Sequence, residues 1–236
     1  MSFRLFVLAA AVLVAGLAAP ASAQDVADEW RKHLLDGATA YGLAQMDVAT
    51  KEIDAAMAIA EKNFVTDDDK MIATLLNVVP LRRVQGKLPE AAALGEQMLA
   101  RIARRDGSDD SPELMAPLIL QAAIYREMMN WDASDKAYLR TIDLHVKYYG
   151  DAHPRTATAM EDRAVMLGKA GRTADGLAVF AEVVDLWVYG FGPNHLREAI
   201  SRRGYAEALR NAGQPEAATE QERRAAEINA IWNAGR

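Results

Sequence analysis

The sequence predicts an all-α protein, a solenoid in which antiparallel helix pairs stack one after another. The chain beyond residue 23 is rich in Ala, Leu, Glu, Arg and Met, which are good helix formers. Its apolar residues recur every three or four positions, as in Met160, Ala164 and Leu167, and no stretch alternates convincingly at period two. Three segments also align with one another without gaps at a spacing of 42 residues, which indicates a repeat protein.

Composition and charge exclude several functional classes. The 236 residues are 51% hydrophobic and 25% charged, which is an ordinary globular composition. The formal charge of −6 argues against a broad basic surface for nucleic acid. The absence of cysteine excludes disulfide scaffolds, thiolate metal sites and cysteine nucleophiles.

The first 23 residues have the organisation of a secretory signal peptide. Arg4 is followed by an apolar run from Leu5 to Leu17, and Ala21-Ser22-Ala23 supplies the small residues of a cleavage site. A membrane-spanning helix needs ~20 apolar residues, so an uncleaved anchor is the weaker alternative. We expect cleavage after Ala23, a periplasmic or secreted product, and no stable membrane insertion of the remaining chain.

Each repeat is predicted to contain a helix, a tight turn and a second helix. Small residues such as Ala164 and Gly176 recur at fixed positions and would let the two helices approach closely. Gly171 and Gly213 are predicted to end first helices in a left-handed conformation. Gly150 is expected to end a second helix in the same way.

Prolines mark both the starts and the interruptions of these helices. Pro112 and Pro154 fall where a first helical turn begins, a position that proline favours. Pro80 and Pro117 fall inside predicted first helices, where each removes a backbone donor, so we expect kinks there.

The repeat pattern divides the chain into three parts. The copies that begin at Ser111, His153 and His195 are preceded by an earlier copy that starts near Asp68. Upstream of it, two predicted helices form a degenerate pair that would act as a cap, and the polar last helix suits a terminal cap facing water. The predicted domains are a signal peptide at 1–23, an N-terminal cap at 24–67, and repeats at 68–236, with units at about 68–110, 111–152, 153–194 and 195–236.

These segments resemble the tetratricopeptide repeat, above all the longer variety of kinesin light chains with a period near 42. The loop Tyr149–Pro154 is similar to the loop that enters each repeat, and the turns Gly171–Gly176 and Gly86–Ala91 are similar to its inter-helix turn. The resemblance covers about Asp68 to Arg236, and Met129 departs from it at a turn glycine. It implies a right-handed superhelix in which the first helix of each pair lines the concave face.

The resemblance also implies which side chains face that groove. Its charge would be mixed, anionic in the third repeat and cationic in the last. We hypothesise that it binds an extended segment or helix of another protein, and that the cationic end holds an acidic side chain or a C-terminal carboxylate. Ordinary solvated helix faces are the alternative. The candidate groove residues are Asn77, Arg83, Arg126, Glu127, Glu161, Asp162, Lys169, Arg203, Glu207, Arg210 and Asn211.

No catalytic or metal-binding pattern is recognisable. The resemblance implies that His153 and His195 cap the helices that follow them, and no histidine has a short metal-ligand spacing. Glu161 and Asp162 are adjacent in a helix, so their side chains point about 100° apart and would not act as an acid–base pair. No nucleotide-binding or nucleophile-elbow string occurs. We predict no catalytic residue, metal or cofactor.

The sequence therefore favours an exported, non-enzymatic protein–protein interaction module, a scaffold or adaptor of the bacterial cell envelope. Its partner would be another protein or a peptide segment, and not nucleic acid. The alternative is a self-assembling structural subunit, that is, a homo-oligomer. A third possibility, an enzyme, would need a site that the sequence does not reveal.

Overall fold

A computed structural model describes residues 22–234, and within that range the chain is helical, with no strand. The fold class predicted from the sequence is confirmed. The predicted signal peptide falls almost wholly outside the described residues, and its cleavage after Ala23 stays a prediction. No helix of the described part is long and apolar enough to cross a membrane.

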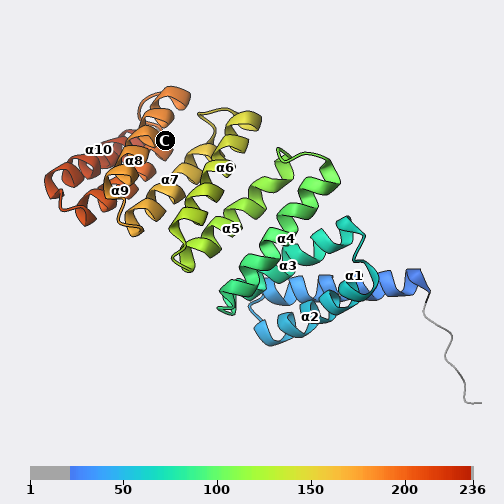
Figure 1. Ribbon diagram of the computed structural model, residues 1–236. Helices are drawn as coiled ribbons and strands as arrows, with labels where there is room; N and C mark the ends of the chain where they lie inside the picture. The colour runs from blue at the N-terminus through green and yellow to red at the C-terminus, as the bar shows by residue number, and fades with distance from the viewer. Residues whose placement is uncertain (1–21, 235–236) are drawn as a thin grey trace, which may run out of the picture.

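Ten α-helices form five successive pairs within the described range, and the pairs stack in chain order from α1–α2 at one end to α9–α10 at the other (Figure 1). Each helix packs mainly against its pair partner and against the helix that follows or precedes it. The helices are α1 (Ala23–Gly42), α2 (Met46–Asn63), α3 (Asp68–Val84), α4 (Leu88–Asp106), α5 (Met115–Glu127), α6 (Trp131–Tyr149), α7 (Pro154–Lys169), α8 (Thr173–Phe191), α9 (Leu196–Asn211) and α10 (Pro215–Ala234), with a short 3₁₀ turn at Pro112–Leu114 before α5.

Small residues hold the helices of a pair close together, as the repeat pattern predicts. A Cβ atom on Gly176 of α8 would lie 2.8 Å from the carbonyl oxygen of Ala164 on α7, so only glycine permits this approach. The large rings of Tyr138 and Phe180 are buried around such contacts. Trp187 is also buried, and its Nε1 donates a hydrogen bond of 2.8 Å to Ser201 on α9.

Polar side chains cap the helices at the predicted places. Nδ1 of His153 accepts from the backbone N–H of Arg155 at 3.1 Å, and Nδ1 of His195 accepts from that of Arg197 at 3.2 Å. Both histidines therefore have the structural role that the repeat resemblance implies. Asp67 caps α3 in the same manner, by accepting from the N–H of Lys70.

The helix ends confirm one prediction about glycine and correct another. Gly171 and Gly213 follow the first helices with φ of 79° and 73°, as expected. Gly150 and Gly192 also have positive φ, but their ψ values are 164° and 167°. The helices α6 and α8 therefore end in an extended conformation of positive φ and not in the left-handed helical one.

The predicted kink at Pro117 is wrong. A 3₁₀ turn precedes α5, so α5 begins only at Met115 and Pro117 lies in its first turn. Backbone N–H groups in a first turn have no intrahelical acceptor, so proline removes no hydrogen bond there. Pro80 does lie inside α3, which continues past it to Val84.

Candidate partner-binding groove

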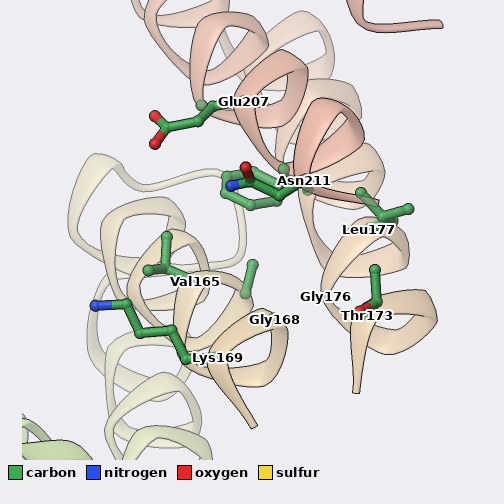
Figure 2. A pocket seen from close by; sticks show the side chains of 12 residues that line it. Val165, Gly168, Lys169, Thr173, Gly176, Leu177, Glu207 and Asn211 are labelled. Carbon is green, nitrogen blue, oxygen red and sulfur yellow. The ribbon is translucent and has the colours of Figure 1, made fainter. Parts of the chain in front are cut away.

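A pocket of about 430 Å³ lies between α7, α8 and α9 (Figure 2). Phe180 of α8 lies at the bottom of the pocket. Three glycines also line it, one from each helix: Gly168 of α7, Gly176 of α8 and Gly204 of α9. Because glycine has no side chain, backbone and ring surface are left accessible between the helices. The pocket is therefore a consequence of small residues at the contact between two successive repeats.

Three of the predicted groove residues form the rim of this pocket. Lys169 comes from α7, and Glu207 and Asn211 come from α9, as Figure 2 shows. All three side chains are exposed, and none has a hydrogen bond or ion pair to another residue in the described chain. An ammonium, a carboxylate and an amide thus surround an apolar floor without being satisfied by the protein itself.

The adjacent acidic pair of α7 is more buried than its sequence suggests. Ser201 of α9 donates a hydrogen bond to Glu161, and burial raises the pKa of Glu161 although this hydrogen bond opposes the rise. Asp162 lines a second cavity, of about 290 Å³, between α5, α7 and α9. Burial raises the pKa of Asp162, and the positive charge of Arg126 opposes that shift.

The remaining candidates are engaged within the protein. Glu127 of α5 accepts from Arg83 of α3 at 2.6 and 2.9 Å, and this contact raises the pKa of Arg83. Arg210 forms a two-point ion pair with Glu222 of α10, so the last repeat has fewer available cations than the sequence indicates. The other contacts are long or local: Arg126 to the hydroxyl of Tyr138 at 3.5 Å, Asn77 to the carbonyl oxygen of Ala73, and Arg203 to that of Ala199.

Sequence reasoning missed the residues that shape the pocket. Gly204 lies in the middle of α9 and Gly168 in the last turn of α7, both before the turn glycines that the repeat pattern marks, and neither was predicted to matter. A glycine inside a helix costs stability relative to alanine, so its presence there was the available signal. No group of three His, Asp or Glu side chains suited to a metal ion occurs in residues 22–234.

Comparison with known proteins agrees with this geometry. A family model described as a tetratricopeptide repeat matches residues 113–175. Nearly identical TPR-like repeats assigned to a kinesin light chain of Podosopora anserina superpose with a TM-score of 0.75 at 17% identity, over 85% of this chain and 95% of that one. The fold is that of a tetratricopeptide repeat solenoid.

Other solved structures share the tetratricopeptide fold at similarly low identity. BtubC (BKLC) from P. vanneervenii has a TM-score of 0.63 at 15% identity, over 90% of this chain and 93% of that one. MamA has a TM-score of 0.59 at 13% identity, over 86% and 93%. No curated protein matches the sequence. The likeness therefore establishes the tetratricopeptide fold.

The sequence resemblance implies that the first helix of each pair lines the concave face. The rim of the larger pocket comes from the first helices α7 and α9. The smaller cavity is lined by the first helices α5, α7 and α9, together with His145 of the second helix α6. The two cavities share no lining residue. The described part of the chain therefore has two separate cavities along its first helices.

Proposed function

We propose that the protein is an exported, non-enzymatic interaction module of the bacterial cell envelope that binds a segment of a partner protein in its groove. Tetratricopeptide folds generally serve as scaffolds for protein–protein interaction. The observation that carries the proposal is the pocket between α7 and α9, where an apolar floor is surrounded by Lys169, Glu207 and Asn211, none of which has a partner within the described chain.

The chemistry of this pocket suits a peptide with an apolar side chain flanked by polar groups. Apolar surface at Phe180 and Leu177 would be covered by the inserted side chain, which gives most of the affinity. Lys169 and Glu207 would then select charged residues on either side. Asn211 has both a donor and an acceptor, and both are complementary to a peptide backbone.

A double charge exchange tests the pocket directly. Lys169→Glu combined with Glu207→Lys leaves the net charge unchanged and alters only the order of charges at the rim. We expect the wild-type protein, crosslinked in cells and affinity-purified, to capture a defined protein that the double variant loses. Equal capture by both proteins would place partner binding elsewhere.

A matched control separates a local effect from a general one. Lys62 of α2 and Glu182 of α8 are exposed, have no partner in the described part of the chain, and lie on second helices. Lys62→Glu with Glu182→Lys also preserves the net charge and should retain the captured partner. Charge reversal at the candidate groove residues Arg203 and Arg210 would be a less suitable test, because Arg210 also joins α9 to α10 through its ion pair with Glu222.

Export is tested by N-terminal sequencing of the processed protein, with Gln24 expected as the first residue. Cleavage there removes Ser22, whose Oγ accepts from the N–H of Asp25 at the start of α1. The processed α1 would thus lose its capping box, and its first turn would be less stable. A full-length product retained in the membrane would contradict export in soluble form.

A further inference from the structure

The smaller cavity, between α5, α7 and α9, has an apolar side and a polar side. Met115 and Ile119 of α5 and Ala159 of α7 provide apolar surface. Asp162 and Arg197 lie on the same cavity and bring opposite charges from two successive first helices. Its volume of about 290 Å³ is at the lower end of what small-molecule sites enclose.

His145 of α6 supplies a buried acceptor to this cavity. The residue is only 3% exposed, and its Nδ1 lies 3.1 Å from the backbone carbonyl oxygen of Arg155. A carbonyl can only accept, so Nδ1 carries the proton and Nε2 has the lone pair. Burial lowers the pKa of His145 and thereby favours this neutral form. Nε2 has no hydrogen-bond partner among the described residues.

Asp162 is a second acceptor without a partner. Its carboxylate is half-buried and forms no hydrogen bond or ion pair in the described part of the chain. The positive charge of Arg126 acts on it only at longer range. A partly desolvated carboxylate is costly unless something donates to it, so a cationic donor in the cavity would offset that cost.

Two exposed arginines also line the cavity, and no carboxylate of the described residues pairs with either of them. Arg197 of α9 and Arg155 of α7 both line it, and neither side chain forms an ion pair in residues 22–234. The Arg155 guanidinium lies 5.6 Å from the centre of the Tyr149 ring. The positive charge of Arg197 opposes the rise in the pKa of Glu161 without forming an ion pair with it. Arg197 is therefore available for an anion, with the two-point geometry that suits a carboxylate.

We infer that this cavity binds a small zwitterion, a free amino acid with an apolar side chain. The ammonium group lies between Asp162 and Nε2 of His145, the carboxylate pairs with Arg197, and the side chain covers Met115 and Ile119. This inference goes beyond the proposed function, because the ligand is a small molecule and the cavity shares no lining residue with the peptide pocket.

Calorimetric titration with L-leucine tests the assignment, beside two analogues that each lack one charge. L-leucinamide lacks the carboxylate, and 4-methylpentanoate lacks the ammonium group. We expect L-leucine to bind at pH 7 and each analogue to bind at least about tenfold more weakly, because each leaves one charged group of the site unpaired. Equal binding of L-leucine and its analogues would overturn the inference.

Two substitutions and a control locate the binding. Asp162→Asn keeps the size of the side chain, and Arg197→Gln leaves a shorter, uncharged polar side chain. Each should weaken L-leucine binding at least about tenfold, with unchanged helical circular dichroism. Arg203→Gln alters another arginine of α9, outside the cavity, and should bind like the wild type. Full affinity in both cavity variants would overturn the site.

Two further outcomes would also refute the inference. One is the absence of any heat on titration with L-leucine at millimolar concentration. The other is binding of a leucine-terminated peptide where free L-leucine does not bind, which would assign the cavity to a macromolecular partner. The Lys169/Glu207 double variant should bind L-leucine normally, so failure of the peptide pocket and failure of this site are distinguishable.

Discussion

Met129 has a backbone conformation that the repeat reserves for glycine. It occupies the position of Gly171 and Gly213 in the later repeats, and its φ is 57°. An L-residue in the left-handed region costs roughly 1–2 kcal/mol. Its side chain is 71% exposed, so little packing compensates for that cost.

We therefore predict that Met129→Gly stabilises the protein. The removal of the steric cost is partly opposed by the greater freedom of glycine in the unfolded chain, so the net gain is about 0.5–1 kcal/mol. Urea denaturation measures it. The reciprocal change Gly171→Ala should destabilise, and a loss of stability in Met129→Gly would contradict the conformation described.

At the same scale, the burial and pairing of charged residues were the least predictable features. The capping histidines follow from their place in the repeat, because a cap is a contact within two residues of the chain. The pairing of Arg210 with Glu222 and the bond from Ser201 to Glu161 join different helices. Periodicity places a side chain on a face, but the partner depends on rotamers and on the neighbouring helix.

Among the elements, the contact between α7 and α8 is the most sensitive to side-chain size. We expect Gly176→Leu to destabilise by about 1–3 kcal/mol, because even a Cβ would approach the Ala164 carbonyl oxygen to 2.8 Å. Thermal melting followed by circular dichroism measures the effect.

Gly168 provides a control for that substitution on the facing helix. A Cβ there meets no atom within 4 Å, so Gly168→Ala should leave stability unchanged or raise it by up to about 1 kcal/mol. If both variants melted like the wild type, the close approach of α7 and α8 would be refuted.

Arg82 joins three helices of the N-terminal half. Its buried side chain on α3 pairs with Asp54 of α2 and with Glu90 of α4, each at 2.6 Å. We predict that Arg82→Met costs about 1–3 kcal/mol, since two charge-assisted hydrogen bonds are lost although both acids remain partly solvated. The midpoint of urea unfolding measures the loss.

The exposed Arg223 gives the matched comparison. It pairs with Glu220 and Glu227 on its own helix, α10, where water screens the ion pairs and they contribute little to stability. Arg223→Met should therefore change stability little. An equal loss in the two variants would show that Arg82 contributes no more than a surface charge.

For the whole molecule, the polarity of the surfaces at the two ends of the solenoid distinguishes an adaptor from a self-assembling subunit. The outer face of α10 carries the ion pairs of Arg223, which suit contact with water. We predict that sedimentation velocity finds a monomer whose sedimentation coefficient is independent of concentration. Association that grows with concentration would favour the structural-subunit alternative. The first residues to test would then be the exposed Leu35 of α1 and Leu43, which follows α1.

The fold was largely predictable at this scale because the same spacing of small and apolar residues occurs in several repeats. One ambiguous helix, such as α5 with its late start at Met115, does not obscure a pattern shared by its neighbours. The groove site was only partly predictable. Lys169, Glu207 and Asn211 were three of the eleven predicted groove residues. The pocket between them depends also on Gly168 and Gly204, which line one cavity only when two repeats stack.

The aromatic rings packed around His195 make tryptophan fluorescence sensitive to whether the last repeat is folded. Trp187 lies parallel to His195 with centroids 6.1 Å apart, and Trp232 meets the same imidazole edge-on at 6.1 Å. Detachment of α10 would separate Trp232 from that ring, while Trp30 remains in α1 at the opposite end. Tryptophan fluorescence can thus distinguish fraying of the last repeat from melting of the whole array without any added label.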